Sequence, residues 1–162
     1  MSNQQINTKS QINTKSIARI AAIQVLYQFA SLKEEYDINS ILIRVKEFYK
    51  GPDLKSDHDI DKKNPIKLKP SYGYLEELVK YTHGNLSEID QIITNHLSKD
   101  WDINDLPTLL RALLRVAICE LRYFPETPKK VVVNEYTDIA NDMLDEKEIG
   151  FVNSLLHKYS LS

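Results

Sequence analysis

Few residues in this chain could act as catalytic groups, and they lack the neighbours that catalysis needs. The 162 residues include 1 Cys and 4 His. Cys119 lies in the most apolar stretch of the sequence, which predicts a buried thiol rather than a nucleophile. None of the histidines falls in a metal-ligand or acid-base motif, and the chain has no glycine-rich phosphate loop, no HExxH and no GxSxG. We therefore predict no catalytic residue, no metal, no cofactor and no enzymatic activity.

The charged residues favour binding instead. Lys129 and Lys130 follow Pro128 as a basic pair on a turn, where they could meet phosphate or remain ordinary solvated lysines. The net charge is -2, yet residues 1–50 carry a net charge of +3 and residues 71–106 a net charge of -5. This pattern indicates that one end of the chain meets phosphate and the middle a basic partner, although uneven surface charge is common in small proteins without either.

Other polar residues stand in apolar stretches or at the start of a helix. Glu120 follows Arg111 and Arg115 in an otherwise apolar segment, which indicates an internal ion pair or a position at a helix edge. Asn134 and Glu135 come early in the next segment, where they could cap a helix, bind backbone or face a ligand. The residues alone leave these alternatives open.

The elements that must position these side chains are all predicted to be helices. With only 4 Gly, and with apolar residues spaced by three and four, the chain reads as an all-α fold of about seven helices. The expected elements are a helix capped by Thr14 or Ser16 and running to Ala30, one from Ile38 with Asn39 or Ser40 as cap and a stop at Gly51–Pro52, one from Leu75 to Gly84, a short one from Ser87 to Leu97, a central helix capped by Asn104 or Asp105 and running to Leu121, and two closing helices over residues 132–143 and 149–159.

The domain organisation is simple. A tandem hexapeptide, residues 5–10 repeated as 11–16, is too polar to pack, so we expect residues 1–16 to be a flexible arm. Residues 17–162 then form a single helical domain, interrupted by a charged loop or insertion over residues 51–70. One cysteine, no secretory signal and no apolar run long enough to span a membrane favour a cytoplasmic protein.

Four segments, in order, carry a resemblance to a known family. They are Ile17–Tyr27, Leu106–Leu121, Pro128–Glu135 and Phe151–Leu156. Together they resemble the NusB family of transcription antitermination factors. The resemblance implies an all-helical protein of two small subdomains without enzymatic activity. It also implies binding to the boxA sequence of ribosomal RNA transcripts jointly with the ribosomal protein NusE, and entry into an antitermination complex on RNA polymerase through other Nus factors.

The same resemblance implies which residues bind. The expected RNA-binding residues are Lys15, Arg19, Lys129, Lys130, Asn134 and Phe151. Cations position phosphates, an amide hydrogen-bonds a base or sugar, and a ring stacks on an unpaired base, although core packing is an equal alternative for Phe151. The expected partner-binding residues are Tyr27, Ile103, Asn104 and Leu110, aided by acidic residues of the middle segment: Glu88, Asp90, Asp100, Asp102 and Asp105. We expect Lys15, Arg19 and the Lys129–Lys130 corner to lie on one side of the protein.

The chain also departs from the family pattern. Ser16 and Ile17 stand where basic residues are common, which predicts weak RNA binding without the partner. Leu110 replaces a frequent Glu, which favours apolar contact over an ion pair there, and Leu144, Lys147 and Ser154 replace Gly, Asp and Gly. The alternatives are a protein–protein adaptor that binds no RNA, and a stand-alone relative of the N-terminal domain of ribosomal RNA cytosine methyltransferases. A homodimer without the partner is a further expectation left open.

Overall fold

The computed structural model describes the backbone of residues 2–51 and 69–162, and the side chains within these ranges from Thr14 onward. The elements are α1 (Ser2–Ser31), α2 (Ile38–Lys50), α3 (Tyr72–Gly84), α4 (Leu86–Asn95), η1 (Ile103–Asp105), α5 (Thr108–Tyr123), α6 (Lys129–Met143) and α7 (Glu146–Leu161). Within the described ranges every regular element is a helix, so the predicted all-α fold is confirmed. Residues 52–68 of the expected charged loop lie outside the described residues.

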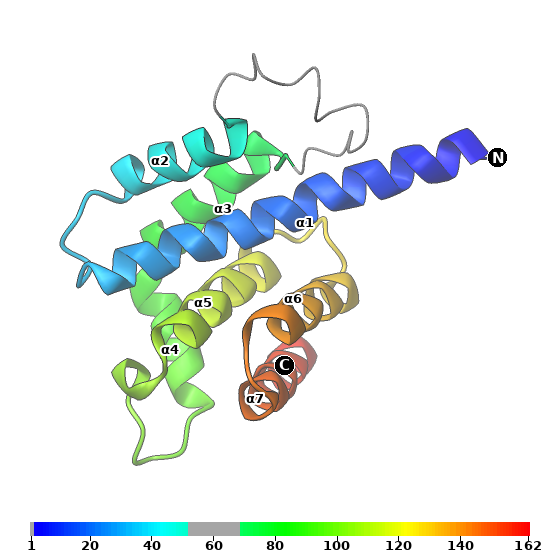
Figure 1. Ribbon diagram of the computed structural model, residues 1–162. Coiled ribbons are helices and arrows are strands. Elements are labelled where there is room, and N and C mark those ends of the chain that lie inside the picture. The colour runs from blue at the N-terminus through cyan, green and yellow to red at the C-terminus, as the bar shows by residue number, and fades with distance from the viewer. Residues whose placement is uncertain (1, 52–68) are drawn as a thin grey trace.

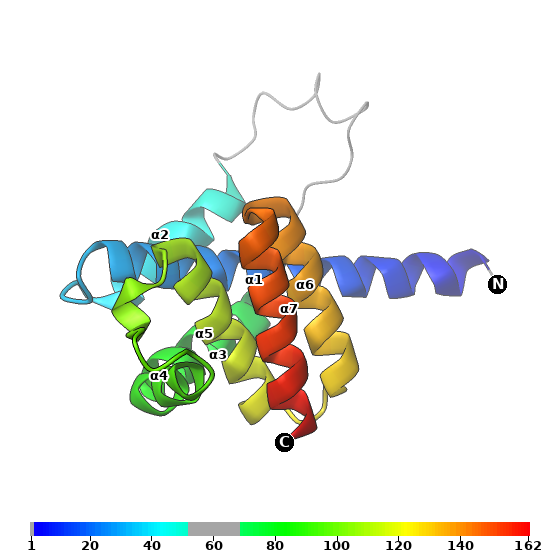
Figure 2. The same ribbon diagram turned by 90° about the horizontal axis from the view of Figure 1, so that it is seen from below.

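The helices form two groups, which meet mainly where α1 packs on α5, with further contacts of α3 on α5 and on α4. In Figure 1, α1, α2 and α3 lie on one side and α4 to α7 on the other, and α1 packs along α5 where the groups meet. Figure 2 shows α6 and α7 side by side, with the N-terminal part of α1 extending past the other helices. The α1–α5 contact is therefore the largest between the groups, and the α3–α5 contact is the next.

The central helix α5 explains the position of the core. All residues from Leu110 to Leu121 are buried, including Arg111, Arg115 and Glu120. On the facing side α1 presents small or branched buried side chains: Ala18, Ala21, Ala22 and Val25. Small residues allow the two helix backbones to approach closely, and charged groups so deep inside must find partners.

The helix starts differ in part from those predicted. Asp37 caps α2, because its carboxylate accepts a hydrogen bond from the Asn39 backbone, so the predicted caps Asn39 and Ser40 were wrong. The predicted cap residues of α5, Asn104 and Asp105, form η1 instead. Asp102 caps η1, and α5 begins after Pro107 without a side-chain cap.

The first helix also begins earlier than predicted. It starts at Ser2, not after a cap at Thr14 or Ser16, and the Ser16 hydroxyl is used in a contact with α6. The expectation that residues 1–16 form a flexible arm is a statement about motion, and it stays a prediction. No helix among the described residues is long and apolar enough to cross a membrane.

The turn after α1 contains two residues in the left-handed region. Lys33 has φ 59° and Glu34 has φ 60°. The Glu34 backbone N–H donates to the Phe29 carbonyl at 2.9 Å, and its carboxylate lies 3.5 Å from Arg115. This turn closes α1 and at the same time ties it to the buried α5.

Candidate nucleic-acid interface

Lys15 lies beside the turn that carries the two predicted phosphate-binding lysines. Its Nζ is 5.2 Å from the centroid of the Tyr74 ring on α3. The Tyr74 hydroxyl is in turn 3.5 Å from Oγ1 of Thr127, just before the Pro128 that leads into α6. Tyr74 thus connects Lys15 to the residue that precedes Pro128, while the expectation that Lys15, Arg19 and the Lys129–Lys130 corner lie on one side stays a prediction.

Arg19 is placed inside the protein. Only 3% of its side chain is exposed, and its guanidinium donates to both carboxylate oxygens of Glu120, with the shortest contact at 2.7 Å. A second carboxylate, that of Glu135 on α6, lies 3.5 Å away. Burial alone would lower the pKa of Arg19, but the hydrogen bonds and charge of Glu120 raise this pKa above its usual value. The guanidinium is thus used by carboxylates and has almost no surface to offer a phosphate.

Two tyrosines complete the surroundings of Glu120. Tyr136 on α6 donates its hydroxyl at 2.7 Å and Tyr74 donates at 2.9 Å. Burial and the nearby Glu120 charge raise the pKa of Tyr74 to about 12, and the same two causes raise the pKa of Tyr136 well above its ordinary value. Both hydroxyls therefore stay protonated and act as donors to the carboxylate at neutral pH.

The helix α6, which contributes Tyr136 to this buried group, also carries the exposed residues predicted to bind RNA. Lys129 and Lys130 are exposed in the first turn, and Asn134 is exposed one turn later. The next residue, Glu135, accepts a hydrogen bond from the Ser16 hydroxyl at 2.9 Å, which joins α6 to α1. Glu135 was expected to cap a helix, bind backbone or face a ligand, and the structure shows instead side-chain contacts with Ser16 and Arg19.

Phe151 lies apart from the lysines. Its half-buried ring lines a hollow of about 490 Å³ together with Trp101, Leu106 and Leu110. Asn153 of α7 meets Thr137 of α6 at 3.5 Å, which places Phe151 level with a point roughly 15 Å along α6 from its first residue. The structure therefore brings Phe151 together with a predicted partner residue and not with the basic corner.

The predicted partner residues fall at two places. Leu110 is 3% exposed and forms part of the hollow beside Phe151, while the mostly buried Ile103 and the exposed Asn104 belong to η1, next to the start of α5. The Asn104 side chain accepts a hydrogen bond from Arg111 at 3.1 Å. Tyr27 is 42% exposed and lines a different groove, between α1 and α2, with Arg44 and Phe48.

Asp145 and Glu148 line the hollow at Phe151, and Asp100, Asp102 and Asp105 are next in sequence to Trp101 and Leu106, which also line it. Several accept backbone N–H groups in the capping boxes of η1 and α7, but among the described residues none of the five forms an ion pair with Lys, Arg or His. Lys99 and Lys147 are the neighbouring cations. This end of the molecule is suited to a basic protein surface.

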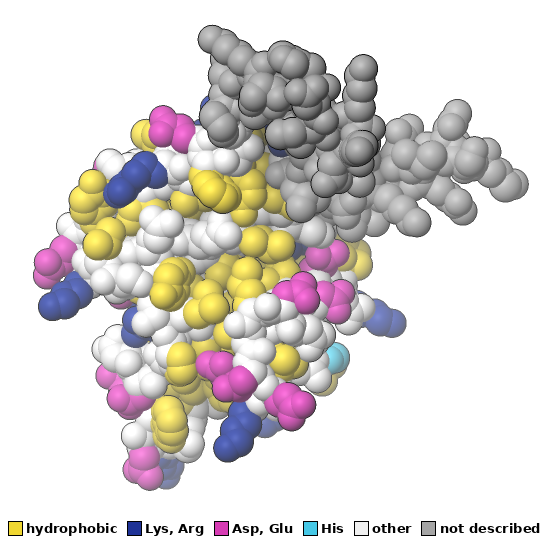
Figure 3. Space-filling view, in the orientation of Figure 1, with side chains coloured by type: hydrophobic (Ala, Val, Ile, Leu, Met, Phe, Trp, Pro, Cys, Tyr) yellow, Lys and Arg dark blue, Asp and Glu magenta, His cyan; other side chains and the backbone are white. Residues whose placement is uncertain are grey.

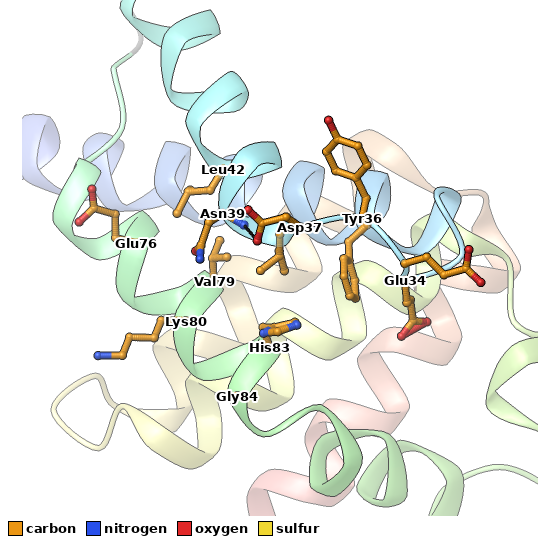
Figure 4. Close-up of a pocket in the computed structure, with 13 residues that line it drawn as sticks. Glu34, Tyr36, Asp37, Asn39, Leu42, Glu76, Val79, Lys80, His83 and Gly84 are labelled. Atoms are coloured by element: carbon orange, nitrogen blue, oxygen red, sulfur yellow. Dashed lines mark hydrogen bonds between the residues drawn. The ribbon is translucent and has the colours of Figure 1, made fainter.

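A larger hollow of about 820 Å³ lies between the α1–α2 turn and α3, as Figure 4 shows. Three of its carboxylates make contacts within the protein: Asp37 caps α2, Glu34 lies against Arg115, and Glu76 pairs with Lys46. No group of His, Cys, Asp or Glu able to hold a metal occurs within the part of the chain that the structure describes. We find no arrangement here that would recognise RNA.

Sequence reasoning missed two aromatic residues. Tyr74 lies in an amphipathic stretch with no motif, and only the folded structure reveals that its ring lies under Lys15. Trp101, the only Trp in the chain, is 52% exposed at the hollow beside Phe151. A single, large, exposed aromatic side chain next to predicted partner residues was a signal that could have identified it.

The thiol is remote from all of these groups. Cys119 is fully buried in α5, and its Sγ lies 3.9 Å from the Leu78 carbonyl oxygen. Burial raises its pKa to about 12, so the reactive thiolate is absent at neutral pH. The expected structural role of this residue agrees with its position.

Comparison with known proteins agrees with this geometry. The sequence profile described as "NusB family" matches residues 16–160. The transcription antitermination protein NusB of Rickettsia bellii is 48% identical over 151 residues, covering 93% of this chain and 92% of that protein. The corresponding protein of Rickettsia massiliae is 49% identical, with 93% and 94% covered. These relatives support the predicted function over the methyltransferase-domain alternative.

Solved structures share the fold. NusB from T. maritima superposes with a TM-score of 0.72 at 25% identity, covering 91% of this chain and 90% of that one. A crystal structure of antitermination factors NusB and NusE in complex with dsRNA contains a chain with a TM-score of 0.67 at 27% identity, covering 90% and 95%. The fold and the non-enzymatic class are therefore those predicted, and the chain belongs to the NusB family of transcription antitermination proteins.

Proposed function

We propose that this chain binds a boxA-type RNA together with a NusE-type ribosomal protein, and so joins an antitermination complex on RNA polymerase through other Nus factors. The observation on which the proposal depends most is the grouping of exposed Lys15, Lys129 and Lys130 around Tyr74 and Thr127. A related NusB has been crystallised with NusE and RNA, which supports the proposal. Binding to a nascent transcript places the protein in the cytoplasm.

The RNA face consists of Lys15, Lys129, Lys130 and Asn134. The three lysines supply phosphate contacts, and the Asn134 amide is free to hydrogen-bond a base or a sugar hydroxyl. Three phosphate contacts correspond to a log–log salt slope of about 2 for a single strand, so the RNA affinity of this chain alone is weak. Arg19 supports this face from inside.

The partner face consists of Leu110, Ile103, Asn104 and Trp101 at one place and Tyr27 at another. An apolar centre rimmed by unpaired carboxylates suits a basic ribosomal protein. Figure 3 shows hydrophobic side chains gathered along the junction of α1 and α5, between these two places. We assign Phe151 to the partner face, beside Leu110 and Trp101, where a base that reaches its ring also meets the bound partner. Such a shared position makes RNA and partner bind cooperatively.

The test is fluorescence anisotropy of a labelled boxA-type RNA, with and without the NusE-type partner, at two salt concentrations. We expect tighter, salt-sensitive binding when the partner is present. The change Lys129→Gln/Lys130→Gln should lower this affinity, whereas Lys33→Gln/Lys80→Gln, an equal change of charge on exposed residues away from the RNA face, should not.

The competing function is a helical adaptor that binds the partner but no RNA. It predicts normal partner binding and no anisotropy change with any RNA, which would overturn the proposal. Equal losses in both lysine pairs would reject the assigned RNA face while leaving RNA binding itself in place.

A further inference from the structure

We propose that Tyr74, together with the buried pair of Arg19 and Glu120, positions the RNA face. This inference rests on the proposed function, because it assigns to residues beneath the surface the task of fixing the distances between the lysines above. None of the three was assigned this role by sequence pattern. They are positioning residues, since the side chains that meet RNA in the proposal are their neighbours.

The cluster joins four helices at one carboxylate. Glu120 of α5 is fully buried, and its two oxygens accept hydrogen bonds from Arg19 of α1, Tyr74 of α3 and Tyr136 of α6. All of these contacts are between 2.7 and 3.1 Å. A buried ion pair adds little net stability compared with a well-packed apolar pair, and one role that can retain such a group is the selection of a single geometry.

Lys15 contacts this cluster directly, Asn134 is adjacent in sequence to a residue bound by it, and Lys129 and Lys130 follow shortly after another such residue. Lys15 itself lies over the Tyr74 ring, and Ser16, its neighbour, bonds Glu135, which follows Asn134. Thr127, two residues before Lys129, meets the Tyr74 hydroxyl. The backbone adds one further tie, since the Ser71 N–H donates to the Thr14 carbonyl at 2.9 Å.

Tyr74 has two separable functions in this arrangement. Its ring lies 5.2 Å from the Lys15 ammonium and 5.7 Å from the Arg19 guanidinium, and it packs on Phe124 at 5.4 Å between ring centroids. Its hydroxyl connects Glu120 to Thr127. Removing the ring releases Lys15, whereas removing only the hydroxyl loosens the turn that leads to Lys129.

The experiment compares Tyr74→Leu, Tyr74→Phe and the wild type in the full-length chain, by RNA anisotropy with the NusE-type partner as a function of salt. Loss of one organised phosphate contact should lower the salt slope by about 0.7 and the affinity at 0.1 M salt by about 5-fold. Tyr74→Leu should show this loss, and Tyr74→Phe a smaller one. Partner affinity without RNA should not change.

A double-mutant cycle with Lys15→Gln separates positioning from general stability. If Tyr74 acts through Lys15, then Tyr74→Leu should cause little further loss in the Lys15→Gln background. A merely structural role predicts equal losses in both backgrounds and an unchanged salt slope, and this result would overturn the inference. If Tyr74→Leu does not fold, Tyr74→Phe and Thr127→Val test the hydroxyl link to the turn instead, with Lys129→Gln in place of Lys15→Gln in the cycle.

The two proposals fail in different ways. No RNA binding by the wild type with its partner would overturn the proposed function. Normal binding by the wild type, with unchanged affinity and salt slope in folded Tyr74 variants, would overturn only the positioning role.

Discussion

At the scale of single residues, the position of Arg19 changes how the basic N-terminal segment is understood. A cation on the first helix of a protein expected to bind RNA suggests a phosphate contact, but this side chain instead neutralises Glu120 inside the core. Its two carboxylate partners lie more than 100 residues away in sequence, on α5 and α6. Its main effect should therefore be on stability.

The change Arg19→Ala should lower the free energy of unfolding by about 3–5 kcal/mol, because it leaves the Glu120 carboxylate buried without its cation. Tyr136→Phe, which removes one hydrogen bond to the same carboxylate, should cost about 1–3 kcal/mol. Urea denaturation followed by circular dichroism measures both. Equal, small losses would show that Glu120 is not dependent on Arg19 for its charge compensation.

Alkaline pH offers a second test at this scale. The folded-state pKa values of Tyr74 and Tyr136 lie above the ordinary tyrosine value. Both the folded and the unfolded chain therefore keep these protons below about pH 10. Above that pH the unfolded chain loses them first, and stability should fall as the pH rises toward 12. Urea midpoints between pH 8 and 11 should fall less steeply for Tyr136→Phe than for the wild type. Parallel curves would contradict this account.

At the scale of elements, the turn after α1 contains avoidable strain. Lys33 is exposed and adopts φ 59°, a conformation that costs side-chain-bearing residues about 1 kcal/mol relative to glycine. Lys33→Gly should therefore raise the melting temperature, by about 2–4 °C, in a thermal denaturation experiment. Lys33→Ala is the control and should not. Glu34→Gly should gain less, because it also removes the carboxylate that lies against Arg115.

The helices themselves were largely predictable, because each shows its core-facing side in three- and four-residue spacing. The central helix was evident from the unbroken apolar run, and the end of α3 at Gly84 from the glycine there. Helix starts were harder to predict, since Asp37 competes successfully with Asn39 and Ser40 for the same free N–H groups. A local pattern gives the length of a helix better than the identity of its cap.

The candidate site was only partly predictable for a different reason. The exposed residues Lys129, Lys130 and Asn134 were identified through a family resemblance, and the structure links their neighbours Thr127 and Glu135 to Tyr74 and Ser16, which contact or adjoin Lys15. The burial of Arg19 and the contribution of Tyr74 depend on contacts between distant helices, which spacing along one helix cannot show. The surface set of residues was thus accessible from the sequence, and the supporting set beneath it was not.

At the scale of the whole molecule, the two proposed faces are separable. Trp101→Ala should lower the affinity for the NusE-type partner at least about 10-fold, because an exposed aromatic side chain at an apolar hollow has the character of an interface hot spot. It should leave the weak RNA binding of the isolated chain unchanged. Lys129→Gln/Lys130→Gln should lower the affinity for RNA and leave the affinity for the partner unchanged. Calorimetry with the partner and anisotropy with RNA distinguish them, and coupled losses in both variants would argue against distinct faces.

The burial of Cys119, the one cysteine in the sequence, has a practical consequence. Because the Cys119 thiol is buried and stays protonated, maleimide dyes should leave the native chain unmodified. A thiol introduced by Asp138→Cys, at an exposed position one turn beyond Asn134 on α6, then becomes the one reactive attachment point without removal of Cys119. A fluorophore there would report the arrival of a transcript in real time.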